Sequence, residues 1–447
     1  MTKTSELSKE PEIDFKIDTL GAAKIESPIK LSSVYGDSIA NYEADYQYIM
    51  YDISVMPGMS SKPIKKGQLL QRAGPRERIY FDSAKAHAGI VTCGGLCPGL
   101  NDVIRAIVMG LWNRYGVRSI TGIRNGYKGF LPEYKFPVMD LCPDSVKFIH
   151  KMGGTVLGSC RGGGERTEDI VDAIERMNLQ MLFVIGGDGS QKGALKIAEE
   201  IEKRGLKIAI VGVPKTIDND LAYIQRSFGF QTAVAKACEA VDSAKIEALG
   251  AHNGVGLVKV MGRHSGFIAA YTALATNEAD VVLIPEVAFK LEGENGLFNY
   301  LEKVLDIKKR AVILVAEGAG EELVGDTEEV DASGNKKLAD VGVFLKDKLK
   351  GHFKKIDKEI SLKYIDPSYI IRSTPANPND SIYCARLGYS AVHAAMAGKT
   401  KMVVSLINNK YVHVPIKMTV SHKKRVHPES SLWRDVVEDT GQPIVMV

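Results

Sequence analysis

The residues best suited to chemistry stand on a short turn with the sequence PKTIDND, residues 214–220, directly after the apolar run KIAIVGV. Two carboxylates and an amide on one turn suit a general base and its supports. Asp218 can take a proton from a hydroxyl group, while Asn219 or Asp220 fixes the geometry or meets a metal ion. A turn rich in Asx residues is also common after a strand without any function. This cluster alone would favour that simpler interpretation.

Two glycine-rich turns are the next candidates, and both suit phosphate. GGDGS, residues 186–190, places Asp188 where a carboxylate can reach a metal ion that bridges phosphates. Asp188 or Ser190 could instead cap the next helix, but a cap does not require three glycines around it. GGLCPGLN, residues 94–101, joins a strand to a helix whose first N–H groups can bind an anion. Simple packing of the turn explains GGLCPGLN about equally well.

Two arginines follow further apolar runs. Arg263 lies in MGRHSG, and Arg372 lies in IIRSTPANPND, which we expect to form a loop before a helix. The guanidinium fork matches a phosphate monoester, so both residues can hold an anionic substrate, although a surface position is the usual alternative. For His264 we prefer a solvated or helix-start position to a catalytic one.

The elements that position these clusters alternate between strands and helices from His87 onward, which is typical of a parallel α/β sheet. Ligands of such sheets sit beyond the carboxyl ends of the strands, and each cluster falls at such an end. One composite crevice is therefore the expected site. The apolar runs predict strands at residues 87–93, 181–187, 207–213, 254–260, 281–287 and 311–320, and helices at 102–116, 191–205, 230–249 and up to Thr276.

The composition excludes several classes of protein. The 447 residues are enough for two or three domains. No apolar run approaches the ~18 residues of a membrane-spanning helix, so we expect no membrane association. The net charge of +4, from 58 basic and 54 acidic residues, is too small for a nucleic-acid binder. Six cysteines without metal-binding spacing, and an N-terminus without a secretory leader, predict reduced thiols and a cytoplasmic location.

Taken in order, the clusters resemble the phosphofructokinase family over roughly residues 87–400, and are most similar to its long ATP-dependent members of protozoan and plant type. The resemblance is carried by GGLCPGLN, GGTVLGSCRGG, GGDGS, PKTIDND, MGRHSG, the PE of VLIPEV, AEGAG and YIIR. It implies two doubly wound, Rossmann-like α/β domains with the active site in the cleft between them. We expect an N-terminal extension over 1–85 that packs on the body, an ATP-binding domain over 86–229 to which the chain returns at about 371–405, a fructose 6-phosphate-binding domain over 230–370, and a C-terminal extension over 406–447.

The resemblance implies transfer of the γ-phosphoryl group of Mg-ATP to the 1-hydroxyl of fructose 6-phosphate. Positions matching the ATP site are Gly95, Arg161, Gly162, Gly187, Asp188, Gly189, Ser190 and Lys215, with Asp188 on Mg²⁺ and Arg161 facing the transferred phosphate. Asp218 matches the general base, supported by Arg161, Thr216 and Asp220. Positions matching the sugar phosphate site are Thr216, Ile217, Asp218, Met261, Gly262, Arg263, Glu317, Lys363, Tyr369 and Arg372.

The choice of donor depends on two positions. Pyrophosphate-dependent members of the family resemble this chain at Lys215 but carry Asp in place of Gly189, where a carboxylate would repel the α-phosphate of ATP. Gly189 therefore favours ATP. A pyrophosphate-dependent enzyme, an NAD or lipid kinase with a GGDG turn, and a silent sugar-phosphate-binding regulatory subunit are the alternatives. The resemblance also implies an allosteric homotetramer, although Asn253 and Gly254 replace an arginine that bacterial members supply across a subunit interface.

Overall fold

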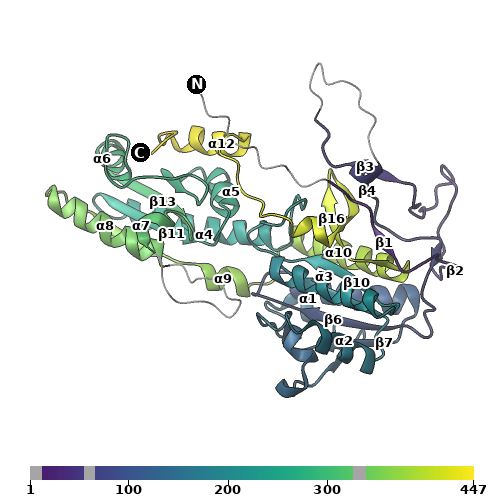
Figure 1. Cartoon of the computed structure of the whole chain (residues 1–447). Coiled ribbons are helices and arrows are strands. Elements are labelled where there is room, and N and C mark those ends of the chain that lie inside the picture. The colour runs from purple at the N-terminus through teal and green to yellow at the C-terminus, as the bar shows by residue number, and fades with distance from the viewer. Residues whose placement is uncertain (1–12, 55–65, 326–338, 447) are drawn as a thin grey trace, which may run out of the picture.

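Two twisted sheets, each covered by helices on both faces, form the body of the protein (Figure 1). The structure is a computed structural model, and it describes residues 13–54, 66–325 and 339–446. Residues 1–12, which carry the expectation about a leader, and residues 326–338, inside the expected sugar phosphate domain, lie outside this description.

The larger sheet has seven strands in the order β17-β16-β10-β9-β6-β7-β8. Its strands are β6 (His87–Thr92), β7 (Ser119–Ile123), β8 (Met139–Asp140), β9 (Met181–Gly186), β10 (Ala209–Pro214), β16 (Met402–Ile407) and β17 (Lys410–Pro415). All neighbours are parallel except at the two edges, where β8 and β17 run antiparallel to β7 and β16.

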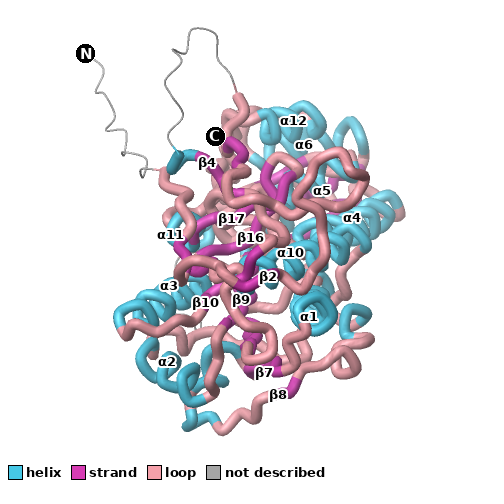
Figure 2. Tube along the Cα trace, turned by 90° about the vertical axis from the view of Figure 1, so that its right-hand side faces the viewer, coloured by secondary structure: helices cyan, strands magenta, loops and turns pink. Residues whose placement is uncertain are grey.

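Alternating side chains of this sheet explain its two helical layers. On β9, Met181, Phe183 and Ile185 belong to one buried cluster, while Leu182 and Val184 belong to another. Since successive side chains of a strand point to opposite faces, both faces need cover. One face is covered by α1 (Leu100–Met109) and α10 (Pro378–Met396), and the other by α2 (Thr167–Arg176) and α3 (Asp188–Lys203), as Figure 2 shows. The predicted doubly wound α/β arrangement is confirmed.

The smaller sheet is entirely parallel, with the order β12-β13-β11-β14. Its strands are β11 (Gly254–Val260), β12 (Val281–Leu283), β13 (Arg310–Ala316) and β14 (Ser361–Ile365). Helices α4 (Phe230–Leu249) and α5 (Phe267–Thr276) pack on one face, and α6 (Leu297–Lys308) and α8 (Val341–Lys355) pack on the other. Gly256 lets α4 approach closely, because a Cβ there would lie 2.8 Å from the carbonyl oxygen of Ala244. The buried cluster that contains α4 also contains α1 and α10, so the two sheets share a core.

Short elements complete the chain. They are η1 (Lys66–Gln68), a π-helical turn η2 (Gly110–Tyr115), η3 (Gly126–Phe130), η4 (Pro132–Tyr134), η5 (Ile149–Lys151), α7 (Glu321–Val324), α9 (Ser368–Ser373), α11 (Ile416–Thr419) and α12 (Ser431–Thr440). The segment between α11 and α12 leads from the larger sheet to the smaller one and is yellow in Figure 1. Within the described ranges, no helix combines the length and the apolar character needed to cross a membrane.

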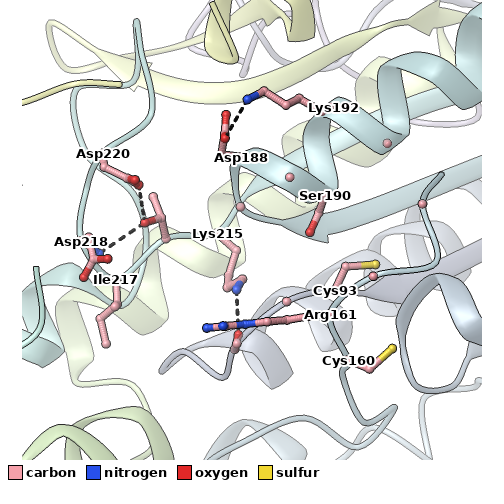
Figure 3. Close-up of a pocket in the computed structure, with 18 of the residues that line it drawn as sticks. Cys93, Cys160, Arg161, Asp188, Ser190, Lys192, Lys215, Ile217, Asp218 and Asp220 are labelled. Carbon is pink, nitrogen blue, oxygen red and sulfur yellow. Dashed lines mark hydrogen bonds and ion pairs between the residues drawn. The ribbon is translucent and has the colours of Figure 1, made fainter. Parts of the chain in front are cut away.

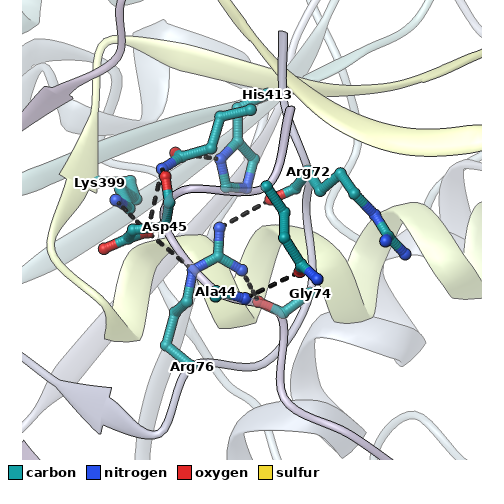
Figure 4. Close-up of polar contacts among 9 residues, drawn as sticks. Ala44, Asp45, Arg72, Gly74, Arg76, Lys399 and His413 are labelled. Atoms are coloured by element: carbon teal, nitrogen blue, oxygen red, sulfur yellow. Dashed lines mark hydrogen bonds and ion pairs between the residues drawn. The ribbon is translucent and has the colours of Figure 1, made fainter. Parts of the chain in front are cut away.

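The N-terminal region has two strand pairs of its own and is tied to the body by a third pair and a polar cluster. β1 (Asp18–Thr19) pairs with β15 (Lys399–Thr400), while β2 (Ile25–Glu26) pairs with β5 (Arg78–Ile79) and β3 (Tyr48–Met50) with β4 (Leu69–Gln71). In the polar cluster, drawn in Figure 4, one oxygen of Asp45 accepts hydrogen bonds from Arg76, Lys399 and Gln71. Burial acts against ionisation of Asp45, but the two cations outweigh it and lower the pKa of Asp45 to about 2. The buried Lys399 of the body thus contacts Asp45, which is also held by Arg76 of the N-terminal region.

Candidate active site

A cavity of about 520 Å³ lies beyond the carboxyl ends of β6, β9 and β10 (Figure 3). Most of the residues expected at the site come together around it: Gly95, Arg161, Gly162, Gly187, Asp188, Gly189, Ser190, Lys215, Thr216, Ile217, Asp218, Asp220, Arg263 and Arg372. Because parallel strands present their carboxyl ends at one edge, clusters distant in sequence meet there.

Five expected residues do not line this cavity. Met261 is buried behind it, where its sulfur lies 3.0 Å from Nε of Arg372. Gly262 and Glu317 do not line the cavity either, although Glu317 is close enough to raise the pKa of Asp218. Lys363 is exposed on β14, and Tyr369 is 82% exposed on α9. Arg372 itself lies in the last turn of α9 rather than in a loop.

The turn GGDGS forms the entrance to α3. Gly187 is the N-cap and Asp188 the first helical residue, so the free N–H groups of α3 face the cavity. Gly186 has no room for a side chain, because a Cβ there would lie 2.3 Å from Cβ of Ser190. At Gly189, by contrast, no atom of the described residues lies within 4 Å of the point where a Cβ would stand. Packing therefore requires Gly186, whereas the space at Gly189 is left to a ligand.

Two cations, Lys215 just after β10 and Arg161 in the loop before α2, approach the turn after β6. Gly94 adopts a left-handed conformation with φ of +88°, which brings its backbone against Lys215. The Lys215 ammonium donates to the carbonyl oxygen of Gly95 at 2.7 Å, and burial lowers its pKa. Arg161 approaches the same turn, with Nη2 3.9 Å from a Cβ placed at Gly95. Backbone N–H groups and two cations make this end of the cavity suitable for a polyphosphate.

The turn that carries Asp218 is braced from within. Thr216 donates its hydroxyl hydrogen to Asp220 at 2.7 Å, and the amide of Asp218 donates to Oγ1 of Thr216 at 3.3 Å. Asn219 has a φ of +56°, and its side-chain oxygen accepts from the amide of Ser227 at 3.0 Å. Asn219 thus fixes the turn and does not face the cavity. The Asp218 carboxyl group is left as the reactive end, since its Oδ1 is buried without a hydrogen-bond partner among the described residues.

The pKa values of Asp218 and Asp220 on this turn are shifted in opposite directions. Burial, with the neighbouring carboxylates of Asp220 and Glu317, raises the pKa of Asp218 to about 8. Burial acts in the same direction on Asp220, but the Lys423 ammonium and the Thr216 hydroxyl outweigh it and lower the pKa of Asp220. Asp218 is therefore a stronger base than an ordinary aspartate, while Asp220 stays ionised. Such a separation suits Asp218, rather than Asp220, to an acid–base role.

Lys423 is a residue of the site that the sequence did not reveal. It comes from the segment between α11 and α12, and its ammonium lies 2.7 Å from Oδ2 of Asp220 and 3.5 Å from Oδ2 of Asp188. The run KKR around it is typical of a solvated surface. Only the path of the chain across the cavity brings Lys423 to the two acids.

The oxygen donors of Asp188 and Asp220 fit a magnesium ion that arrives with phosphates. Mg²⁺ is commonly held by one or two carboxylates together with phosphate oxygens and water. The described residues contain no group of three or more potential metal ligands. A single ammonium already contacts both carboxylates, so their negative charges converge on one point. The donor set therefore suits a cation shared with a ligand.

Comparisons with known proteins give a consistent result. Residues 87–395 match the family described as Phosphofructokinase. An ATP-dependent 6-phosphofructokinase of Borreliella burgdorferi is 53% identical over 98% of this chain and 99% of its own length. ATP-dependent 6-phosphofructokinase 4, chloroplastic, of Arabidopsis thaliana is 46% identical over 93% of this chain and 78% of its own. The ATP-dependent 6-phosphofructokinase of Trypanosoma cruzi is 42% identical over 97% and 89%, respectively.

Solved structures agree on the fold. A pyrophosphate-dependent phosphofructokinase of Marinobacter aquaeolei superposes with a TM-score of 0.65 at 22% identity, over 81% of this chain and 92% of that chain. The T-state phosphofructokinase of Pichia pastoris superposes with a TM-score of 0.62, also at 22% identity, over 85% of this chain and 39% of that one. At this identity the likeness concerns the fold alone.

Proposed function

Because the chain belongs to the phosphofructokinase family, we propose that it is an ATP-dependent 6-phosphofructokinase, which transfers the γ-phosphoryl group of Mg-ATP to the 1-hydroxyl of fructose 6-phosphate. One observation carries the chemical part of this proposal. A carboxyl group with a raised pKa, Asp218, shares a cavity with the amino end of α3 and the cations Arg161 and Lys215. A base for an alcohol and a cradle for phosphates are the two parts that phosphoryl transfer requires.

The roles of the residues follow from these positions. The Gly94–Gly95 turn and the amino end of α3 hold the donor phosphates, and Arg161 and Lys215 neutralise charge on the transferred group. Asp188 and Asp220 would hold Mg²⁺, which supplies further charge neutralisation at the donor. Asp218 takes the proton of the acceptor hydroxyl group at its unpartnered Oδ1. Thr216 keeps Asp220 turned away from that oxygen.

The sugar phosphate is proposed to lie near Arg263 and Arg372. Both arginines line the cavity, and Arg372 is close enough to lower the proton affinity of Asp218. A guanidinium group binds a phosphate monoester through two parallel hydrogen bonds. Met261 supports Arg372 from behind through its sulfur.

ATP is preferred over pyrophosphate because of the space at Gly189. Gly189 has no positive φ and no neighbouring atom within 4 Å of a Cβ, so neither strain nor packing among the described residues requires glycine there. The open space suits the α-phosphate and nucleoside of ATP. A pyrophosphate-dependent enzyme remains the alternative, since the buried Lys215 can bind either donor.

The experiment that tests this proposal measures phosphorylation of fructose 6-phosphate with Mg-ATP and with Mg-pyrophosphate, for the wild type and Gly189→Asp. We expect the wild type to use ATP. Gly189→Asp should fold normally and lose at least about 100-fold in kcat/KM for ATP, because an uncompensated carboxylate beside a phosphate costs roughly 3 kcal/mol. Gly189→Ala is the matched control, since it fills the same space without charge. Turnover with pyrophosphate only, or full ATP activity of Gly189→Asp, would overturn the proposal.

We further propose a cytoplasmic homotetramer with allosteric control. Each of the six cysteines, all of them described, is a free thiol, which supports a reducing compartment. The exposed Tyr369 and Ile370 of α9 offer apolar surface that suits a subunit interface.

A further inference from the structure

The C-terminal strap, residues 421–427, crosses the catalytic turn and is fixed to both sides of it. Lys423 forms an antiparallel bridge with Leu221, and the amide of Lys424 donates to the carbonyl oxygen of Asp220 at 2.9 Å. The amide of Val426 donates to Oε1 of Glu286 at 2.7 Å. The same Glu286 carboxylate also accepts from the amide of Gly266, at the start of α5. Hydrogen bonds of the strap backbone therefore fix the strap against the catalytic turn and against Glu286.

The side chains of the strap divide between anchoring and the cavity. Lys424 turns inward and donates to the carbonyl oxygens of Ile224 at 2.6 Å and Gln225 at 3.1 Å. Lys423 turns into the cavity and contacts the carboxylates of Asp220 and Asp188. The side chains of Asp220 and Asp188 are only 11% and 18% exposed, so bulk water solvates their charges poorly. Neighbouring lysines of one segment thus have separate tasks.

Lys423 is the cation that joins the two acids. Lys192 also contacts Asp188, at 3.0 Å, but it is 54% exposed and does not reach Asp220 in any hydrogen bond or ion pair of the described residues. A magnesium ion bound to carboxylate oxygens lies about 2.0–2.1 Å from them. The Oδ2 atom of Asp220 cannot keep a lysine ammonium at 2.7 Å and accept such an ion from the same side, because the two cations would repel each other.

We propose that Lys423 is the built-in counter-ion of Asp188 and Asp220, and that its ammonium leaves these carboxylates when a divalent cation binds. The inference rests on the proposed function only for the claim that the cation enters with ATP. No covalent bond is made or broken in this exchange, and one cation or the other faces the two acids throughout. The strap stays in place through Lys424 and Val426, so only the Lys423 side chain has to move.

The exchange has a consequence that can be measured without turnover. In the nucleotide-free protein, Lys423 competes with divalent cations and weakens their binding. An opposite charge within about 4–6 Å changes the proton affinity of a carboxylate by one to three pKa units, and a metal cation experiences the same field. Removing the ammonium should therefore tighten divalent binding by about tenfold or more.

The test is a titration of the full-length, nucleotide-free protein with Mn²⁺ alone, followed by electron paramagnetic resonance of the free ion. Lys423→Met should bind Mn²⁺ about tenfold or more tightly than the wild type. Lys424→Met, a change on the adjacent residue of the same strap, should leave the affinity near that of the wild type. Lys423→Arg keeps the charge and should also stay near the wild-type value. Circular dichroism of each variant verifies folding, and Lys423→Arg keeps the test valid if Lys423→Met does not fold.

Three outcomes would overturn the proposal. These are wild-type or weaker Mn²⁺ binding by Lys423→Met, an equal gain in Lys424→Met, or a gain of the same size in Lys423→Arg. The second outcome would mean that loosening of the strap, and not charge, controls the acids. Failure of the proposed function is detected separately, by a lack of wild-type turnover with ATP, because the Mn²⁺ titration contains no nucleotide and no sugar.

Discussion

Replacing Asp218 by Asn should stabilise the protein while removing its activity. Asp218 is partly buried beside Asp220 and Glu317, and its Oδ1 has no hydrogen-bond partner in the described part of the chain. Its ionised form is therefore costly in the folded state. The amide of Asn has the size of the carboxyl group but no charge, so the variant removes this cost. It also removes the proton acceptor, and kcat should fall by about 10²–10⁴.

The magnitude follows from the shift in pKa. The pKa of Asp218 is about 8 in the folded protein, against 3.8 for an unperturbed aspartate. A raised folded-state pKa means that the folded protein binds the Asp218 proton more tightly than the unfolded chain does. The stability that this proton contributes is complete below the unfolded pKa and is lost as the pH rises toward 8. At neutral pH the lost part of the shift is about three pKa units, so Asp218 lowers the free energy of unfolding by roughly 4 kcal/mol relative to an uncharged side chain. Because the side chain lines an open cavity, we take this as an upper limit and expect about 2 kcal/mol.

The assay is urea unfolding of the wild type and Asp218→Asn at about pH 5 and about pH 8. The stabilisation by Asp218→Asn should grow by at least about 1 kcal/mol between the two pH values. Asp220→Asn is the matched control on the same turn. Its charge is paired with Lys423, and its lowered pKa means that this contribution is present above the unfolded pKa and lost only as the pH falls. It should therefore destabilise at both pH values. A stability difference for Asp218→Asn that does not change with pH would refute the reasoning.

Two further changes test the polar cluster of the N-terminal region and the proposed sugar phosphate site. Asp45→Ala removes the acceptor shared by Arg76 and Lys399, both about 5% exposed, and should lower the free energy of unfolding in urea by about 1.5–3 kcal/mol with kcat unchanged. The control Asp82→Ala removes an exposed ion pair with Lys85 and should cost less than about 0.5 kcal/mol. Equal losses in the two variants would contradict the account of the polar cluster. Arg372→Ala should raise the KM for fructose 6-phosphate by about 10–100-fold in steady-state assays, with a smaller rise for Arg372→Lys; an unchanged KM would remove Arg372 from the sugar phosphate site.

The sequence predicted the local elements of the fold well. All six expected strands exist, and the helix expected at residues 230–249 has those bounds in α4. The strands β7, β14, β16 and β17 were not expected. Which strands pair is decided by contacts far apart in the chain, so the place of β16 beside β10 follows from tertiary packing and not from its composition. The helix α9 also escaped prediction, because its six residues, which lie between Pro367 and Pro375, are too few to display a helical period.

The sequence indicated the residues of the cavity that stand on motif-bearing turns more readily than the residues that support them. Asp188 and Asp218 stand in glycine-rich or Asx-rich turns after strands, and such turns have a recognisable pattern. Lys423 has no pattern of its own, since lysine pairs are common on solvated surfaces. For Lys363 and Tyr369 the family resemblance predicts a place in the site that the structure of one chain does not show. The family resemblance assigns them to the sugar phosphate site, yet within one chain both are exposed away from the cavity. Their assignment remains a prediction.

The supports of the catalytic turn explain why distant segments are needed around it. An unpaired, partly buried carboxyl group at Asp218 favours any movement that would expose it to water. Asn219 in the turn and Tyr223 three residues after it both have positive φ, which adds strain. Backbone bonds from the C-terminal strap hold one side of the turn. The ring of Tyr223 packs against Tyr51 of the N-terminal region, with centroids 5.3 Å apart, and against His422 of the strap. The two terminal regions therefore stabilise a conformation that the residues of the turn alone would not keep.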